Sequence, residues 1–307
     1  MPELPEVETI KRVIEPQIQG LVIENVTVRR PEVVAYPAAN VFCKALTKQV
    51  ISSMARRGKF LIIQLNSGDR IILHLRMTGC LLLTPADYPE EKHTHVIFRL
   101  GKVTEQEHSA EKKTFTKKVH SIEQACSVEL RFSDMRRFGR FWLLQKDEID
   151  ACSGIEKLGA EPSAPELTAA YLSARFGKRK KSIKECLLDQ NAIAGIGNIY
   201  SDEILFTAGI YPARPANSLH LEEWEQLAAV IPERISYFIL TNKITPEEYL
   251  ETKGQDYRNT PFLQVYGHSG KPCPKCGETL CRIVLGGRSS VYCPVCQKNL
   301  PSRPHFS

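Results

Sequence analysis

The start of the chain contains a candidate nucleophile. The side chain of Pro2 is too small to protect Met1 from aminopeptidase, and removal of Met1 leaves the ring nitrogen of Pro2 as a free secondary amine. An α-amino group titrates near ~8, so part of it is unprotonated at neutral pH. Secondary amines add to aldehyde-like carbons and form iminium ions, which drive elimination. The alternative is a helix start, with Pro5 in the first turn and Glu6 and Glu8 complementing the helix dipole, and the stretch alone favours it.

Four cysteines near the end of the chain form two C-x-x-C pairs with sixteen residues between them: Cys273 and Cys276, then Cys293 and Cys296. This spacing is typical of a zinc ribbon in which four thiolates hold one ion tetrahedrally, and the alternative is a redox-active pair. Four protein ligands leave zinc no open position, so the predicted site is structural. The hairpin between the pairs carries Arg288, whose guanidinium could contact a phosphate.

Two further stretches have residue types that suit nucleic acid. The segment from Gly195 to Tyr200 follows the cationic run from Lys178 to Lys184 and opens a helix, whose free N-terminal amides suit a phosphate. A helical hairpin with a tight turn explains this segment equally well. Met77 and Phe138 lie close to arginines, and such apolar side chains can enter a base stack while Arg136 meets the orphaned base. Burial of both in a core is the alternative.

Composition indicates a soluble globular protein with an anionic partner. The 307 residues carry a net charge of +6, and 42% of them are apolar, enough for two domains. No apolar run approaches the ~20 residues that span a bilayer, and no signal sequence opens the chain, so we expect a cytoplasmic protein with reduced cysteines and no membrane partner. Clusters of cationic residues favour binding to phosphates, although any single cluster is usually just part of a solvent-exposed surface. The clusters are Arg29-Arg30, Arg56-Arg57-Lys59, Arg136-Arg137-Arg140 and Lys178-Arg179-Lys180-Lys181.

Changes in residue pattern divide the chain into segments. Apolar residues at positions 7, 10, 14 and 18 predict a helix, β-branched runs from 22 to 144 predict strands, and later helices include 219–229 and 232–242. The sequence therefore predicts an α+β protein with an N-terminal β-sandwich with flanking helices and a C-terminal helix-two-turn-helix domain that ends in the zinc ribbon. The predicted boundaries are 1–146 for the sandwich with an inserted loop at 101–127, 147–165 for a linker, 166–253 for the helical domain, 254–261 for a loop, 262–298 for the ribbon and 299–307 for a tail.

Six motifs follow one another along the chain. They are Pro2 to Thr9, Arg57-Gly58-Lys59-Phe60, Arg76-Met77-Thr78-Gly79, Arg136-Arg137-Phe138-Gly139, Gly195 to Tyr200, and the four-cysteine ribbon. Together they resemble the bacterial formamidopyrimidine-DNA glycosylase family, over the chain from Pro2 to about Lys298. The resemblance implies a bifunctional base-excision repair enzyme that removes oxidised purines, notably 8-oxoguanine and formamidopyrimidines, and then cuts the strand by β,δ-elimination. It also implies a monomer that holds one structural zinc ion and binds double-stranded DNA carrying an oxidised purine or an abasic site.

The resemblance further implies catalytic roles. Pro2 would attack C1′ of the flipped nucleotide, and Glu3 would be the acid/base partner for the sugar. Lys59 and Arg288 would contact phosphates and assist the eliminations. The residues implied at the lesion pocket are Glu6 and, on a mobile loop at 254–261, Gly254, Gln255 and Tyr257.

DNA-binding roles are implied for a second set of residues. Met77, Arg136 and Phe138 would fill the vacated stack and pair with the estranged cytosine. The residues implied at backbone phosphates are His93, Arg179, Lys180, Lys184 and Asn198.

Some positions depart from the family pattern. The 101–127 insertion has no usual counterpart, Ala160 replaces the usual proline, and Gly254 is followed by Gln255 where the family has glutamate. Lesion preference is therefore less determined than the reaction class. Two alternatives remain. One is the sister endonuclease VIII type, which favours oxidised pyrimidines. The other is a DNA-binding zinc-ribbon protein without catalysis, and the presence of Pro2, Glu3 and Lys59 argues against it.

Overall fold

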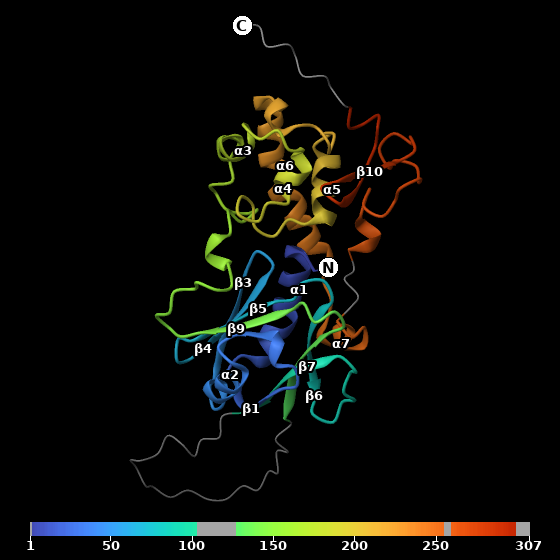
Figure 1. Ribbon diagram of the computed structural model, residues 1–307. Coiled ribbons are helices and arrows are strands. Elements are labelled where there is room, and N and C mark those ends of the chain that lie inside the picture. Colours follow the sequence, from blue (N-terminus) through green and yellow to red (C-terminus); the bar gives the residue numbers. More distant parts are fainter. Residues whose placement is uncertain (1, 103–126, 255–258, 299–307) are drawn as a thin grey trace, which may run out of the picture.

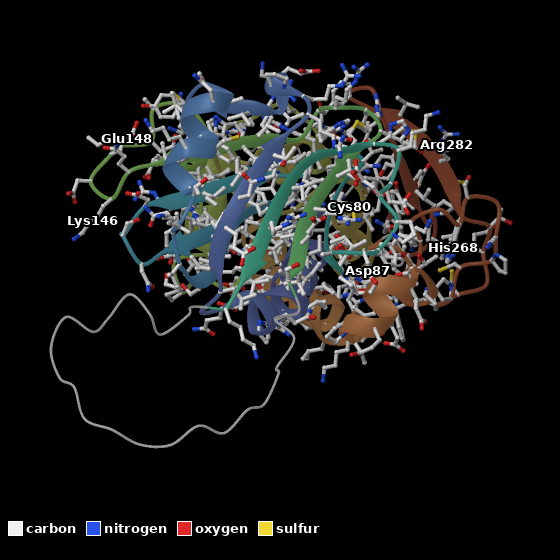
Figure 2. All side chains as sticks on the ribbon, turned by 90° about the horizontal axis from the view of Figure 1, so that it is seen from below. Cys80, Asp87, Lys146, Glu148, His268 and Arg282 are labelled. Atoms are coloured by element: carbon white, nitrogen blue, oxygen red, sulfur yellow. The ribbon has the colours of Figure 1, made fainter. Side chains whose placement is uncertain are left out.

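The computed structural model describes residues 2–102, 127–254 and 259–298 of the chain. These residues form two lobes, and helix α1 (Leu4–Ile18) lies where the lobes meet (Figure 1). One lobe contains most of the strands, and the other contains most of the helices. In the view from below, Lys146 and Glu148 mark one end of the molecule, whereas His268 and Arg282 mark the ribbon at the opposite end (Figure 2).

The N-terminal lobe is built on two sheets. A four-stranded antiparallel sheet has the order β1-β7-β8-β6, and a five-stranded sheet has the order β2-β9-β5-β4-β3, in which β2 runs parallel to β9. The strands are β1 (Val22–Val28), β2 (Val34–Tyr36), β3 (Ile51–Arg57), β4 (Phe60–Leu65), β5 (Arg70–His74), β6 (Gly79–Pro85), β7 (Thr94–Gly101), β8 (Val128–Asp134) and β9 (Arg140–Leu144).

Aromatic side chains join the two sheets. The ring of Phe141 on β9 lies 5.9 Å from that of Phe98 on β7 and 5.1 Å from that of Phe132 on β8, measured between centroids. Phe42 packs on the same cluster from helix α2 (Ala39–Leu46), a helix that the strand-like pattern of this region did not predict. The sheets therefore face each other across one core, as the predicted sandwich requires.

The alternation of residues along β5 builds a second, smaller core. Ile71 and Leu73 point into the core between the sheets, and Ile72 points to the other face. There Ile72 joins Trp142 in a cluster against which Leu158 of the linker packs. The linker thus covers the outer face of the five-stranded sheet.

Helix α1 contributes to both lobes. Its apolar stripe follows the predicted spacing, and Val7, Ile10 and Ile14 are buried in the sandwich core. Leu4, one turn earlier, is buried in the core of the helical lobe instead. The helix begins before the predicted stripe because Glu3 and Glu6 cap it reciprocally.

The helices of the C-terminal lobe are α3 (Ala169–Phe176), α4 (Ile183–Leu187), α5 (Asn198–Thr207) and α6 (Leu221–Thr241). The prediction of separate helices on either side of Pro232 is wrong, because α6 runs through it. Proline removes one helical hydrogen bond, but Val230, Ile231 and Ile235 are buried around it, and their packing holds the two halves in one helix.

Helix α7 (Pro246–Glu251) lies within the predicted helical segment but packs on the other lobe (Figure 1). Tyr249 is buried in the sandwich core, and its hydroxyl donates to the carbonyl oxygen of Leu81 at 3.0 Å. The chain therefore returns to the N-terminal lobe before the ribbon. None of the helices among the described residues is long and apolar enough to cross a membrane.

The ribbon hairpin consists of β10 (Cys281–Leu285) and β11 (Arg288–Tyr292). Gly286 and Gly287 form its tip with φ of +53° and +76°, in the left-handed region that glycine adopts without strain. Phe206 of α5 is buried in the ribbon's small core. The hairpin is therefore docked on the helical lobe.

The aromatic junction between the sheets predicts the stability of the N-terminal lobe. Phe141→Ala removes the ring that contacts Phe98 and Phe132, and we expect a loss of about 3–5 kcal/mol in the free energy of unfolding. Ile149→Ala is the control, because Ile149 is 85% exposed and its loss should stay within about 0.5 kcal/mol. Urea unfolding followed by tryptophan fluorescence measures both, and equal losses would contradict this account of the core.

Candidate active site

Glu3 lies at the contact between α1 and the start of α5. Its carboxylate accepts hydrogen bonds from the backbone N–H groups of Gly197 at 2.6 Å and Ile199 at 2.9 Å, and the side chain is 1% exposed. A Cβ atom at residue 197 would lie 2.3 Å from the carboxyl carbon of Glu3, so glycine is required there. The prediction that these amides are free for a phosphate is therefore wrong: the helix N-terminus binds a carboxylate of the chain itself.

Electrostatics make Glu3 a candidate proton carrier. Burial raises the pKa of Glu3, and Glu6 raises it further, while Lys59 and the backbone amides oppose the rise. A buried carboxyl group with a raised pKa holds its proton more readily than an exposed one, which suits acid/base work at a reacting sugar.

Glu6 lies next to Glu3 and is also buried. One carboxylate oxygen accepts from the backbone N–H of Glu3 at 2.8 Å, and the other accepts from the hydroxyl of Tyr200 and from the side-chain amide of Asn259 at 3.3 Å. Burial, followed by the charge of Glu6, raises the pKa of Tyr200 well above its usual value, so the phenol remains a donor. Tyr200 and Asn259 were not predicted as site residues, because their partners lie 194 and 253 positions away.

Lys59 and Arg288 line one cavity of about 590 Å³, together with Asn198 and His74. Lys59 lies in the turn between β3 and β4, together with Gly58, and is 8% exposed. Burial lowers the pKa of Lys59 and nearby Arg288 lowers it further, while Glu3 opposes the shift. The structure thus brings together two cations from opposite ends of the chain.

Asn198 and His74 complete this cavity in different ways. The side-chain oxygen of Asn198 is buried and has no hydrogen-bond partner in the described part of the chain, which marks a place where a ligand group is expected. His74 was not predicted. Its Nδ1 accepts from the backbone N–H of Arg76 at 2.9 Å, and its ring meets that of Phe60 edge-on at 4.5 Å.

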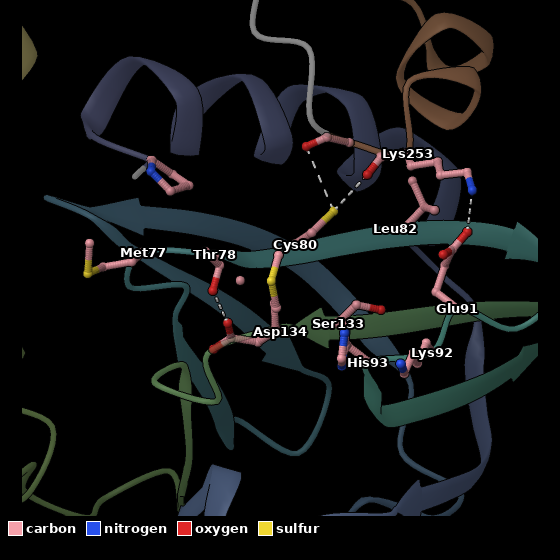
Figure 3. A pocket seen from close by; sticks show the side chains of 14 residues that line it. Met77, Thr78, Cys80, Leu82, Glu91, Lys92, His93, Ser133, Asp134 and Lys253 are labelled. Atoms are coloured by element: carbon pink, nitrogen blue, oxygen red, sulfur yellow. Dashed lines mark hydrogen bonds and ion pairs between the residues drawn. The ribbon is translucent and has the colours of Figure 1, made fainter.

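Pro2 lines a second cavity of about 330 Å³ (Figure 3). Its other walls include Met77, Cys80, His93 and Gly254, so the predicted nucleophile and the start of the predicted lesion loop face the same space. Figure 3 shows the thiol of Cys80 directed at the carbonyl groups of Lys253 and Gly254. The predicted pocket residues Gln255 and Tyr257 lie outside the described residues.

Met77 and Phe138 are exposed rather than buried, with relative exposures of 43% and 46%, so the core alternative is wrong for both. The guanidinium of Arg136 lies between them, 4.7 Å from the ring centroid of Phe138 and with Nη1 3.0 Å from Sδ of Met77. Asp134 holds the loop, since its carboxylate accepts from the backbone N–H groups of Arg136 and Gly139. Such an exposed group can enter a duplex.

Met135 directly precedes Arg136, in the loop that carries Phe138, and the sequence analysis did not predict it as a site residue. It is 66% exposed and lines the cavity of Pro2. A single methionine next to arginines carries no pattern that would have marked it.

Several cations that were predicted to contact phosphates form ion pairs with carboxylates of the chain instead. Arg56 contacts Glu8 at 2.9 Å and Glu161 at 2.9 Å, and Arg57 contacts Glu161 at 3.2 Å, so these two arginines join the linker to β3. Lys184 is fully buried.

The prediction that Lys184 contacts a DNA phosphate is wrong, because its side chain is buried and bonded within the protein. Its Nζ donates to Asp202 at 2.6 Å and to the carbonyl oxygen of Ser289 at 3.1 Å. Ser290 also donates to Asp202, at 2.6 Å. A buried charge needs such partners, and here they fasten the ribbon hairpin that carries Arg288.

The remaining predicted contacts are nearer the surface. Lys180 is exposed, and Arg179 is partly buried with an ion pair to Asp189 at 2.7 Å. His93 lines the cavity of Pro2.

The four cysteines of the ribbon form a zinc site. Their sulfur atoms all lie within 4.8 Å of one another. Cys273 and Cys296 have sulfurs 3.9 Å apart, and Cys276 and Cys293 have sulfurs 3.5 Å apart. Tetrahedral thiolates at ~2.3 Å from zinc have sulfurs about 3.8 Å apart, so the geometry fits one structural ion.

Known protein families match each of the three parts of the fold. Family models match the formamidopyrimidine-DNA glycosylase N-terminal domain at residues 1–141, its H2TH domain at 158–247, and the zinc finger found in FPG and IleRS at 270–299. The chain is 39% identical to the formamidopyrimidine-DNA glycosylase of Pelotomaculum thermopropionicum, covering 97% of this chain and 99% of the relative. It is 41% identical to the Moorella thermoacetica enzyme, covering 92% and 94%.

Solved structures of Lactococcus lactis Fpg have the same fold. One complex with DNA containing an abasic site has a TM-score of 0.81 at 30% identity, and a complex with DNA containing Fapy-dG has a TM-score of 0.81 at 31% identity. Each covers 97% of this chain and 100% of the other.

The sandwich, the helix-two-turn-helix lobe and the zinc ribbon, with buried carboxylates and cations where they meet, define a DNA repair glycosylase. The chain belongs to the formamidopyrimidine-DNA glycosylase family.

The zinc site predicts the effect of losing one ligand. Cys296→Ala should lower the zinc content from about one per chain to near zero and weaken DNA binding, because the hairpin that carries Arg288 loses its anchor. Cys281→Ala is the matched control, since Cys281 lies on the same hairpin but outside the cluster. Elemental analysis of both proteins measures the metal, and stoichiometric zinc in Cys296→Ala would contradict the assignment.

The environment of His74 predicts a pH dependence of stability. Burial, with help from Arg76 and Lys59, lowers the pKa of His74 from 6.5 to about 3. Between these values the unfolded chain binds one more proton than the folded chain, so this residue costs stability as pH falls below ~6.5, at about 1.4 kcal/mol per pH unit. His74→Asn keeps an acceptor for Arg76 and removes this dependence. Urea unfolding of both proteins at pH 7.5 and 5.5 measures the difference, and parallel losses would refute it.

Proposed function

We propose that the protein removes oxidised purines from double-stranded DNA and then cleaves the strand through a Schiff base on Pro2. The observation that carries the proposal is the position of Pro2: it lines a cavity, and the paired buried carboxylates of Glu3 and Glu6 follow it directly. The DNA complexes of Lactococcus lactis Fpg with abasic and Fapy-dG sites support the same substrate class.

In the proposed first step, the nitrogen of Pro2 attacks C1′ of the flipped nucleotide, and the bond from C1′ to the base breaks. The base leaves with the bonding electron pair and takes up the proton that the Pro2 nitrogen loses. Glu3 protonates the sugar oxygen as the ring opens, which its raised pKa favours. The product is an iminium ion that joins Pro2 to C1′, and it acts as the electron sink for the following steps.

In the proposed eliminations, the iminium acidifies the C2′ proton, a base removes that proton, and the 3′ phosphate departs. A second proton loss releases the 5′ phosphate. Lys59 and Arg288 line one cavity and would bind these phosphates as charge develops on them. No organic cofactor enters the scheme, and the zinc ion holds the hairpin in place.

Flipping of the base is assigned to the exposed loops. Extrusion of a nucleotide costs a few kcal/mol, and an apolar wedge offsets part of that cost. Met77 and Phe138 would fill the vacated space, and Arg136 would pair with the estranged base. His93, Lys180 and Asn198 are proposed phosphate contacts, with Arg179 after release from Asp189. We further propose that the protein acts as a monomer on chromosomal DNA in the cytoplasm.

Covalent trapping tests the mechanism. Borohydride should trap the wild-type protein on an abasic-site duplex, because it reduces the iminium to a stable amine. Pro2→Gln, whose larger side chain retains Met1, should lower the trapped fraction at least about a hundredfold, since the amine is displaced by one residue. Pro5→Ala is the control and should trap normally. A wild-type protein that binds the duplex but is never trapped would favour the alternative of a non-catalytic DNA-binding protein.

The same preparation decides lesion preference. Duplexes with 8-oxoguanine, formamidopyrimidine or thymine glycol are compared by excision rate, and we expect both purine lesions to react faster. Faster excision of thymine glycol would support the endonuclease VIII type instead.

A further inference from the structure

Asn259 lies beside the buried carboxylates although it is distant from them in sequence. Its side chain is 3% exposed. The side-chain nitrogen donates to the hydroxyl of Tyr200 at 2.8 Å and to Glu6 at 3.3 Å. The side-chain oxygen accepts from the hydroxyl of Thr241, at the end of α6, at 3.1 Å. Both ends of the amide are therefore used.

The directions of these hydrogen bonds are consistent with one another. An ionised carboxylate only accepts, and Glu6 receives three donors: the hydroxyl of Tyr200, the amide of Asn259 and the backbone N–H of Glu3. The phenol donates to Glu6 and accepts from Asn259. A network in which each member is satisfied holds one geometry, and loss of one donor leaves a buried acceptor without its partner.

The network acts on the N-terminus through a single backbone bond. The N–H that Glu3 donates to Glu6 belongs to the peptide unit between Pro2 and Glu3. The orientation of Glu6 therefore influences the orientation of that peptide, and with it the ring nitrogen of Pro2. No side chain of α1 provides what Asn259 provides, because the donors to the second oxygen of Glu6 come from Tyr200 and Asn259.

We propose that Asn259 is a positioning residue for the reaction: it holds Glu6 so that the Glu3 backbone keeps the Pro2 amine aimed into its cavity. This inference rests on the proposed function for its catalytic consequence. Asn259 does not contact the substrate in this proposal, so its loss should slow the attack without abolishing it.

Two substitutions of nearly equal size separate the contributions. Asn259→Leu removes the side-chain NH2 group that donates to Glu6 and to Tyr200. Asn259→Asp replaces that NH2 group with a carboxylate oxygen, which places a second carboxylate beside Glu6. We expect borohydride trapping on an abasic-site duplex to slow about ten- to a hundredfold in both, as misplacement of a nucleophile does. In Asn259→Asp two acidic groups share one site, so the low-pH limb of its rate profile should move upward by about one pH unit or more.

The control is Thr260→Ala, which changes the residue that follows Asn259 and leaves Asn259 itself unchanged. Thr260 is exposed, whereas Asn259 is 3% exposed and donates to Glu6, so this control leaves the hydrogen-bond network in place. We expect its trapping rate within about threefold of wild type. Affinity for a duplex with a tetrahydrofuran site should also stay within about threefold in every variant, because no proposed DNA contact is removed.

A measurement without DNA decides the inference independently of the proposed function. Formaldehyde and cyanoborohydride methylate the N-terminal amine, and mass spectrometry of the N-terminal peptide follows the rate against pH. We expect a changed pH profile at Pro2 in both Asn259 variants and an unchanged profile in Thr260→Ala, with thermal unfolding and zinc content confirming folded protein.

The outcomes separate cleanly. Wild-type methylation and trapping rates in folded Asn259→Leu and Asn259→Asp would overturn the inference. A fall in trapping matched by an equal fall in duplex affinity, with an unchanged methylation profile, would also overturn it and indicate a structural role. If the wild-type protein is not trapped at all, the proposed function fails, while the methylation profiles still decide the role of Asn259.

Discussion

The hydrogen bonds from the N-terminus of α5 to Glu3 are the interaction on which the rest of the site depends. They join the first turn of the chain to a segment almost two hundred residues later, and they cross from one lobe to the other. Leu4 reinforces the contact, because its N–H donates to the carbonyl oxygen of Gly195 at 3.1 Å and its side chain is buried in the helical lobe. A helix N-terminus is a ready anion site, and in this chain it holds the carboxylate of Glu3 next to the proposed nucleophile Pro2. The first turn of α1 is thereby fixed to the helical lobe.

Tertiary contacts divide the cations into two groups. Arg56, Arg57 and Lys184 have carboxylate partners and serve the architecture: the first two hold the linker through Glu161, and the third holds the ribbon hairpin through Asp202. Lys59 and Arg288 instead line a cavity, where burial lowers the pKa of Lys59 and the charge of Arg288 lowers it further. An anionic substrate that lies between them would relieve this repulsion. A bound phosphate would therefore offset the electrostatic cost of placing Lys59 and Arg288 close together.

The zinc ion and the buried ion pair act on the same hairpin from opposite ends. The cysteines hold the base of β10 and β11, and Lys184 and Asp202 hold the residues that follow Arg288. The glycines at the tip leave the backbone free to turn between these anchors. Arg288 is thus presented from a rigid base beside a short glycine tip, which suits its proposed role as a phosphate contact.

Local patterns in the sequence were sufficient for the elements and for motif-bearing residues. The stripe of α1, the alternation in β5 and the paired cysteines each depend on spacing within one segment, so the helix, the sandwich strands and the zinc site were predictable. The proposed roles of Pro2 and Glu3 came from the motif in which these residues stand. Partner choice was not predictable: no local pattern tells whether Lys184 meets a phosphate or Asp202, or that Asn259 lies against Glu6. Those outcomes depend on which segments the two cores bring together, since burial forces each charge and amide to find a partner that only the folded chain supplies.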